Sequence, residues 1–399
     1  MDSTTSGAPG TQPGPQDIAE EFPSLERWTY VNHAAVSPWP TRTRRAVERF
    51  AAWNNQDGPA NFPDWVENEQ ALRERAARLL HASADGSDIA LVPNTTEGIN
   101  IVARGLDWRS GDNLVTAREE FPTNRMAWQA LEADGVARRS VDVDATEDPE
   151  GALLAAMDER TRVLAVSSVR WTDGFRLDLE RLGAACHSAG VLFFVDAIQH
   201  FGALRIDVEA AKIDCLAAGG HKWQMAPEGL GLFYCSQRWR HRLAPLKQGW
   251  RMLENPFRFD DPERAVHPGG ARFEPGTPAT MGQFALNASL SLQEDWGQAW
   301  IEDRILANTE RLLAGLADLA GFEAMTNPAQ HRCSGIVAVL PKRGTARQVV
   351  AALAERRVIA IPRGDWVRIS PHAYQGRAVV DRVLNALETA DAAQRETFL

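Results

Sequence analysis

The sequence predicts an α/β protein, with a mostly parallel sheet flanked by helices and a smaller α+β unit after it. Short apolar runs alternate with helical patterns from about residue 88 to 235, which is typical of such a sheet. One run, VLFFVDA at 191–197, is apolar throughout except for its acid, and this indicates a strand buried on both faces. Shorter elements follow from residue 321 and predict the smaller unit.

Apolar spacing places the individual elements. Residues 41–54 and 65–80 repeat apolar side chains every three and four positions, which is the period of an amphipathic helix. Asn94, Thr95 and Thr96 follow a short apolar run, so we expect a helix to begin there with Thr95 or Thr96 as its cap. The predicted strands of the large unit are 89–93, 113–117, 137–143, 162–169, 191–197 and 230–234, and its later helices are 178–189, 281–296 and 300–319. In the smaller unit the predicted strands are around 323–325, 334–340, 358–362 and 366–370, and the helices are 346–356 and 376–390.

This pattern divides the chain into four parts. Residues 1–16 are rich in Gly, Pro, Ser and Thr, and we expect them to be disordered. Residues 17–40 hold a short strand and a loop that we expect near the active site and beside the C-terminal unit. Residues 41–300 are expected to form the large domain, and residues 301–399 the small α+β domain.

Composition narrows the function classes. The 399 residues carry a net charge of −10, which disfavours nucleic acid or a membrane surface as a partner. The four cysteines are widely spaced without a CxxC pair, so we expect neither a zinc site nor a disulfide framework. No run is long enough to span a bilayer and no apolar leader follows Met1, so we expect a cytoplasmic enzyme.

A lysine in a glycine-rich loop carries the strongest chemical signal. Lys222 follows Gly219, Gly220 and His221, and it comes 26 residues after Asp196 at the end of the apolar run. A desolvated lysine can hold an aldehyde as a Schiff base, and a buried acid can keep a ring nitrogen protonated. A lone lysine usually lies on the surface and has no catalytic role. A lysine in a Gly-Gly-His loop between two strands, with an acid at the end of the first strand, is a much more specific signal.

Other residues are candidates for the same site on weaker grounds. Gln199 can hydrogen-bond a ring hydroxyl, and His221 together with Thr95 and Thr96 at a helix N-terminus can hold a phosphate. Most such threonine turns only cap a helix. Phe121 follows a predicted strand and can stack on a planar ring, although a plain core aromatic would look the same. His33 has two interpretations that the sequence leaves open: it lies near the site, or its ring is hydrogen-bonded within its own loop.

Several motifs together resemble the class-V aminotransferases of PLP fold type I, the group of cysteine desulfurases, isopenicillin-N-epimerase-like proteins and kynureninase. The motifs are VDAIQHFGA, GGHKW and PEGLGLFY, with YVNHAAVSP, PNTTEGINIV, REEFPTNRMAW, FEPGTPAT and VRISPHAYQ elsewhere in the chain. The resemblance covers nearly everything after about residue 25. It implies a large domain with a sheet of the seven-stranded type, bound pyridoxal 5′-phosphate (PLP), and a homodimer with shared active sites.

The resemblance also implies roles for individual residues. Lys222 takes the Schiff base, Asp196 the pyridine nitrogen and Gln199 the ring oxygen. Phe121 takes the ring-stacking position, where many relatives have histidine. Thr95, Thr96 and His221 bind the phosphate, and Thr277 of the other subunit reaches it across the dimer interface. Arg368 matches the arginine that binds the substrate α-carboxylate, a task that suits a forked guanidinium.

Departures from the family pattern bear on the reaction. Residues 363–367 fill the loop where desulfurases carry a nucleophilic cysteine, and no cysteine is present there. Gly219 stands where several relatives place a phosphate-binding serine. Trp171 replaces an asparagine of the desulfurases, and with His33 it is a candidate to line the substrate pocket.

The expected reaction starts from an external aldimine and a carbanion at Cα of an amino acid. We favour aminotransferase chemistry, with a C–S or other β-lyase as the first alternative and an epimerase as the next. A catalytically inactive scaffold of the same fold is the alternative from another class.

Overall fold

A seven-stranded sheet forms the centre of the large domain in the computed structural model, which describes residues 12–260 and 263–397. The strand order is β2-β8-β7-β6-β5-β3-β4, and β8 runs antiparallel to the other six strands. The strands are β2 (Ile89–Val92), β3 (Asn113–Ala117), β4 (Ala137–Val141), β5 (Thr161–Ser167), β6 (Leu192–Asp196), β7 (Cys215–Gly219) and β8 (Gly231–Cys235). The predicted fold class is thereby confirmed.

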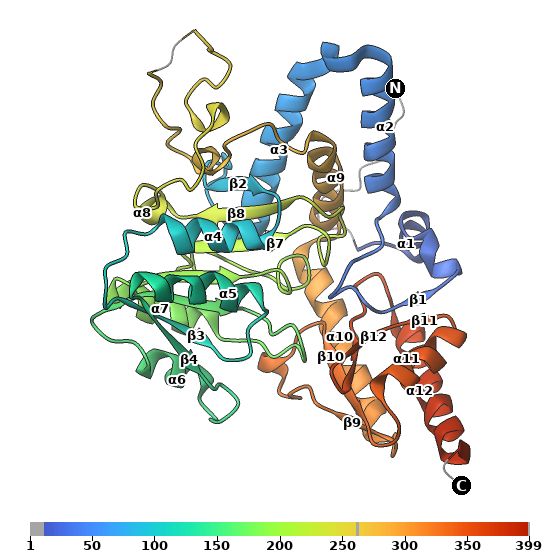
Figure 1. Ribbon diagram of the computed structural model, residues 1–399. Helices are drawn as coiled ribbons and strands as arrows, with labels where there is room; N and C mark the ends of the chain where they lie inside the picture. The colour runs from blue at the N-terminus through green and yellow to red at the C-terminus, as the bar shows by residue number, and fades with distance from the viewer. Residues whose placement is uncertain (1–11, 261–262, 398–399) are drawn as a thin grey trace.

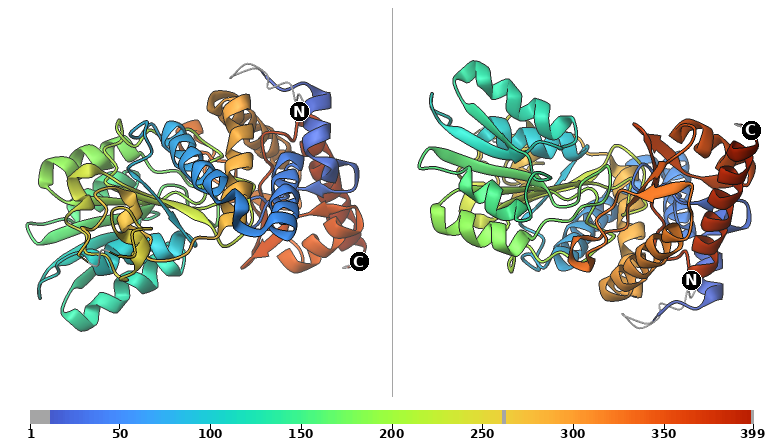
Figure 2. Two further views of the ribbon diagram at one scale, coloured as in Figure 1. Left: turned by 90° about the horizontal axis from the view of Figure 1, so that it is seen from above. Right: turned by 90° about the horizontal axis from the view of Figure 1, so that it is seen from below.

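Helices cover both faces of this sheet (Figure 2). The helices of the large domain are α2 (Thr41–Asp57), α3 (Phe62–Leu80), α4 (Thr95–Gly105), α5 (Thr123–Gln129), α6 (Pro149–Ala155), α7 (Leu179–Ala189), α8 (Gln237–Arg240) and α9 (Thr280–Trp296). Side chains of α4 and α5 pack in one core with Leu192 and Phe194. Side chains of α3, α6, α7 and α9 pack in another with Phe193 and Val195. Because successive side chains of a strand point to opposite faces, β6 serves two cores and must be apolar throughout.

The small domain is built on a four-stranded antiparallel sheet of order β12-β13-β10-β9. Its strands are β9 (Phe322–Ala324), β10 (Val337–Pro341), β12 (Ile361–Arg363) and β13 (Trp366–Ile369), and its helices are α10 (Gln298–Ala317), α11 (Ala346–Glu355) and α12 (Arg377–Thr397). The N-terminal strand β1 (Thr29–Tyr30) pairs in parallel with β11 (Val358–Ile359). Figure 1 shows β1 and β11 side by side although they come from opposite ends of the chain.

Two local expectations differ from the structure. The cap of α4 is Asn94, whose side chain accepts a hydrogen bond from the amide of Glu97 at 2.9 Å, and neither Thr95 nor Thr96 caps it. Helix α1 (Pro15–Glu21) begins inside the range predicted to be disordered, because Asp17 accepts a bond from the Gly14 amide and proline suits a first helical turn. Residues 1–11 of that range lie outside the described residues. No described helix is long and apolar enough to cross a membrane.

Candidate active site

One edge of the large sheet gathers the predicted cofactor residues. Thr95 follows β2, Phe121 follows β3, Trp171 follows β5, Asp196 ends β6 and Lys222 follows β7. These five strands are mutually parallel, so their carboxyl ends meet at one edge. Ligands of open α/β sheets bind outside that edge. The fold therefore explains why side chains up to 127 positions apart in sequence address one site.

Asp196 is the acid of this site. Its side chain is buried, and Oδ1 accepts a hydrogen bond from the Ile198 amide at 3.0 Å. Burial raises the pKa of its carboxyl above the usual range, against the lowering effect of that amide and of Lys222. A cation placed against Asp196, such as a protonated ring nitrogen, would reverse this shift and keep the carboxylate ionised.

Lys222 supplies the amine. Burial is the main reason that its pKa falls to about 7, and the cations Arg368 and Arg363 lower it further against the opposing effect of Asp196. The Nζ atom lies 5.7 Å from the centroid of the Phe121 ring. A lysine with a pKa near 7 is neutral in a large share of molecules at neutral pH, and the neutral amine is nucleophilic and can accept a proton.

The N-terminus of α4 is suited to the phosphate. Its first amides have no partner within the helix, and an N-terminus attracts anions. Because Asn94 caps the helix, the hydroxyls of Thr95 and Thr96 are not used as caps. Thr95 Oγ1 accepts a bond from the Gly219 amide at 2.9 Å, which ties this turn to the end of β7.

Glycine at position 219 leaves room for His221. A Cβ added there would come within 3.2 Å of the His221 ring, so the imidazole would have to shift slightly to admit a serine. Burial and the neighbouring Lys222 lower the pKa of His221. Its imidazole can still donate one hydrogen bond to a phosphate in the neutral form.

Gln199 is fixed by two contacts from other segments. Its carbonyl accepts a bond from the Trp223 indole at 2.9 Å, and its amide donates to the Ala34 carbonyl at 3.0 Å. One amide hydrogen is left for a ring oxygen, since an amide nitrogen carries two. The orientation of Gln199 therefore depends on the N-terminal loop.

Both ring nitrogens of His33 are hydrogen-bonded to other residues of the protein. Nδ1 lies 2.8 Å from the Ser370 carbonyl and Nε2 lies 2.7 Å from the Tyr374 hydroxyl. The ring is completely buried, and burial holds its pKa well below the usual value. His33 has no free nitrogen for a substrate in this arrangement, and it instead joins the N-terminal loop to the small domain.

Arg368 on β13 places its guanidinium, from the small domain, at the carboxyl edge of the large sheet. Its Nη1 donates to the Trp171 carbonyl at 2.8 Å. Its Nε and Nη2 are buried and have no hydrogen-bond partner among the described residues. Buried donors are normally satisfied, so two open ones indicate a place for an anion. Trp171 also packs its ring edge-on against Phe121 at 5.5 Å.

Thr277 lies apart from this group. It is exposed, in the segment between η5 (Gly270–Phe273) and α9. No hydrogen bond between described residues joins it to the other predicted site residues. Its assignment to a phosphate stays a prediction that needs a second subunit.

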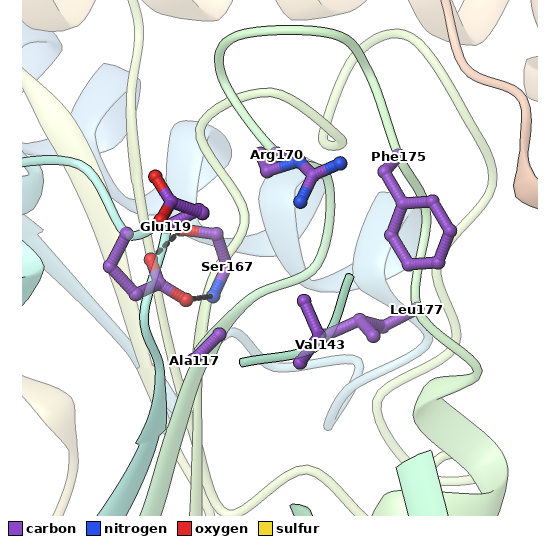
Figure 3. Close-up of a pocket in the computed structure, with 8 residues that line it drawn as sticks. Ala117, Glu119, Val143, Ser167, Arg170, Phe175 and Leu177 are labelled. Carbon is purple, nitrogen blue, oxygen red and sulfur yellow. Dashed lines mark hydrogen bonds between the residues drawn. The ribbon is translucent and has the colours of Figure 1, made fainter. Parts of the chain in front are cut away.

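Two charged residues of the site were not singled out from the sequence. Arg363 on β12 stacks its guanidinium 5.9 Å from the centroid of a Trp171 ring. Glu120 precedes Phe121, and its buried carboxylate accepts bonds from the Ser167 amide at 2.7 Å and from Asn124 at 2.8 Å. Dashed lines in Figure 3 mark the bonds that Ser167 donates, beside the small pocket lined by Arg170, Phe175 and Leu177. The available signal for Glu120 was its place just after a strand and directly before Phe121.

Glu120 should make stability depend on pH. Burial raises its pKa from 4.5 to about 7, against the effect of its hydrogen bonds and with a further increase from Asp196. A raised carboxyl pKa gives stability that is complete below pH 4.5 and is lost as the pH rises through about 7. Relative to Glu120→Gln, the wild-type apoprotein should lose up to about 3 kcal/mol between pH 5 and pH 8. Thermal unfolding of both proteins across this range measures the difference.

The neighbouring Glu119→Gln is the matched control, because Glu119 is exposed. Its melting temperature should follow the wild type at every pH. If Glu120→Gln also follows the wild type, Glu120 is ionised throughout this range and the prediction is wrong.

No hydrogen bond between described residues joins the thiol of any of the four cysteines to these side chains. All four are free and buried. Cys333, the one nearest in sequence to Arg368, donates to the Asn327 carbonyl at 3.3 Å. No cysteine therefore supplies a nucleophile at the site.

These residues fit a PLP cofactor. Such a cofactor and its substrate need an amine, a buried acid, a helix N-terminus with hydroxyls beside it and a guanidinium with open donors, and all four are present here. Lys222, Asp196, Gln199 and the α4 turn would hold the cofactor.

Comparison with known proteins agrees with this geometry. The aminotransferase class-V family model matches residues 30–380. A probable cysteine desulfurase of Methanothermobacter thermautotrophicus is 32% identical over 323 residues, which cover 78% of each chain. Isopenicillin N epimerase of Streptomyces clavuligerus is 28% identical over 332 residues, or 79% of this chain and 83% of the relative.

Solved structures of C-DES are similar along almost the whole chain. One is a lysine-to-alanine mutant with glycine covalently linked to its PLP cofactor; its TM-score is 0.87 at 26% identity, over 93% of this chain and 98% of that one. The other is a complex of C-DES, named as a cystine C–S lyase, with its reaction product cysteine persulfide. Its TM-score is 0.86 at 26% identity, over 92% of this chain and 99% of that one.

Proposed function

Because the chain belongs to the aminotransferase class-V family and is a PLP-dependent enzyme, we propose that it transfers the amino group of an amino acid to a keto acid. The arrangement around Lys222 carries this proposal. Its amine is the ionisable group that faces the Phe121 ring, and Phe121 has no proton to exchange. One amine that takes a proton from Cα and returns it to a neighbouring carbon is what transamination requires.

Each residue has a distinct task in this reaction. When bound, PLP supplies an electron sink for the negative charge that develops at Cα. Asp196 keeps the ring nitrogen protonated, and Gln199 donates to the ring oxygen. Thr95, Thr96 and His221 hold the phosphate at the α4 turn. The open donors of Arg368 bind the substrate α-carboxylate, so that the α-proton lies within reach of Lys222.

Elimination at Cβ is the second candidate. It is favoured by the similarity to the cystine lyase C-DES and to the desulfurases, together with the lack of a cysteine at the site. A thiolate can leave without an enzyme-bound acid, so Lys222 alone suffices. Epimerisation is less favoured, because it needs a second proton carrier opposite Lys222 and Phe121 stands there. An inactive scaffold is disfavoured because Lys222, Asp196 and Arg368 are all intact.

Spectroscopy and product analysis test the proposal. The purified protein should absorb in the visible range, and borohydride reduction should leave pyridoxyl phosphate on Lys222 in peptide mass spectra. Turnover that requires a keto-acid acceptor supports the aminotransferase. If pyruvate and ammonia form without a keto-acid acceptor, the enzyme is a β-lyase and not an aminotransferase. A protein that gains no visible band even after addition of PLP would overturn both.

We further propose a homodimer in which Thr277 of each subunit completes the phosphate site of the other. Its exposure in one subunit is consistent with that role. Thr277→Glu should weaken PLP binding by repelling the phosphate, and Lys222→Ala should inactivate its own site. Mixed dimers of the two variants contain one native site, so activity should return to about a quarter of wild type after subunits of equal amounts are exchanged at random.

Each variant incubated alone is the control, and light scattering gives the subunit number. If the mixture stays as inactive as its parts while the subunits exchange, Thr277 does not act across an interface. We also propose a cytoplasmic location, since four unpaired cysteines suit a reducing compartment.

A further inference from the structure

Two arginines, and not one, project from the small domain toward Lys222. Arg363 and Arg368 lie on the antiparallel strands β12 and β13, where Ile361 pairs with Arg368 and Arg363 pairs with Trp366. Side chains two apart on a strand share a face, so Arg363 and Arg368 stand on the same face as diagonal neighbours. Both arginines lower the pKa of Lys222, so the two charges bear on the same space.

Arg363 has no counterion in the part of the chain that the structure describes. None of the ion pairs between described residues includes Arg363 or Arg368. Its Nε is buried and has no hydrogen-bond partner among the described residues. Its guanidinium stacks on Trp171, whose carbonyl already holds Arg368. Burial lowers the pKa of Arg363, as expected for a cation that is desolvated without a carboxylate.

None of the anionic groups assigned so far in the proposed reaction pairs with Arg363. The substrate α-carboxylate needs one fork, and Arg368 has two open donors for it. Asp196 is assigned to the ring nitrogen. Arg363 is half-buried, and a second, partly desolvated cation is costly unless a second anion meets it.

From this geometry we propose that Arg363 binds an anionic group on the substrate side chain, so that the enzyme selects dicarboxylic amino acids, a specificity that rests on the proposed function. Substrates of this class are aspartate, glutamate and, with a carboxylate beyond a disulfide, cystine. The Trp171 ring keeps the Arg363 guanidinium in place through stacking. Arg363 is thereby a specificity-determining residue, whereas Lys222 and Asp196 serve every substrate.

Binding of unreactive acids tests the proposal without turnover. Calorimetry on the PLP-loaded protein should give a Kd for succinate or glutarate that is at least about 10-fold lower than for butyrate, as one charge-assisted contact provides. Arg363→Gln should bring the dicarboxylates within about threefold of butyrate, because an amide cannot replace the charge. Arg363→Lys should keep part of the preference, since it keeps the charge but not the fork.

Kinetics give the second measurement. The ratio of kcat/KM for glutamate over glutamine, or aspartate over asparagine, should fall about 100-fold in Arg363→Gln. Arg368→Gln should weaken mono- and dicarboxylates alike. Arg347→Gln, an exposed arginine of α11, is the control for arginine loss and should follow the wild type. The visible absorption band confirms in each variant that the fold and the cofactor are retained.

Two binding results would overturn the inference. One is wild-type binding of butyrate as tight as that of the dicarboxylates. The other is an equal loss of both ligand types in Arg363→Gln, which would mean that both arginines clamp the α-carboxylate. If the enzyme shows the visible cofactor band but acts on neutral amino acids alone, the dicarboxylate specificity is wrong and the proposed function still holds. A protein with no visible band defeats both.

Discussion

Lys222→Ala should lower turnover by about 10⁴-fold, because the variant loses the group that accepts and returns the α-proton. It also loses the amine that holds the cofactor covalently, so the visible band should shift and borohydride should no longer label the chain. Stopped-flow absorbance after mixing with substrate separates proton removal from binding. Added methylamine should restore part of the rate, since it fits the space left by the side chain.

The control for this variant is Lys342→Ala, which removes an exposed lysine of the small domain. Its turnover should stay within about twofold of wild type, as for most surface substitutions. If Lys222→Ala retains turnover of the same order as Lys342→Ala, another group carries the proton and the role given to Lys222 is wrong.

Asp196→Asn should lower kcat by about 10³-fold, comparable to removing one strong electrostatic stabiliser of a transition state. The amide is the same size and its oxygen can still accept the Ile198 amide, so the strand end should keep its shape. What is lost is the charge that keeps the ring nitrogen protonated. Steady-state kinetics measure the effect, and the visible band reports that the cofactor is still bound.

Asp214→Asn is a matched control from the same sheet. Asp214 is also buried, accepts the Phe193 amide at 3.0 Å and has a pKa that burial raises to about 6. It precedes β7, at the edge opposite to Lys222. Its replacement should lower the melting temperature more than kcat. Equal losses of kcat in the two variants would mean that Asp196 serves stability and not the cofactor.

Much of the large domain follows from local patterns alone. The apolar runs predicted six of the seven strands of the sheet, whereas β7 and the antiparallel direction of β8 were not predicted. A parallel arrangement then implies that residues just after several strands meet at one edge, as Thr95, Asp196 and Lys222 do. The motif resemblance identified the same residues independently.

Side-chain partners were beyond the reach of such patterns. His33 was an even choice from the sequence, and its two bonds come from Ser370 and Tyr374, which are 337 and 341 residues away. The cap of α4 was assigned to a threonine, whereas Asn94 competes better for the Glu97 amide. The partners of His33 cannot be deduced from the neighbouring residues in the chain, whereas the cap is a local contact that the stronger N-cap preference of asparagine could have predicted.

The sequence by itself determined the fold class, the family and the residues that carry the chemistry, because strand periodicity and short motifs are local properties. The tertiary structure decided the electrostatics of the site. Lys222 has a lowered pKa because segments of two domains desolvate it and place Arg363 and Arg368 nearby. Desolvation and charge are sums over neighbours in space, and for this site those neighbours come from both ends of the chain.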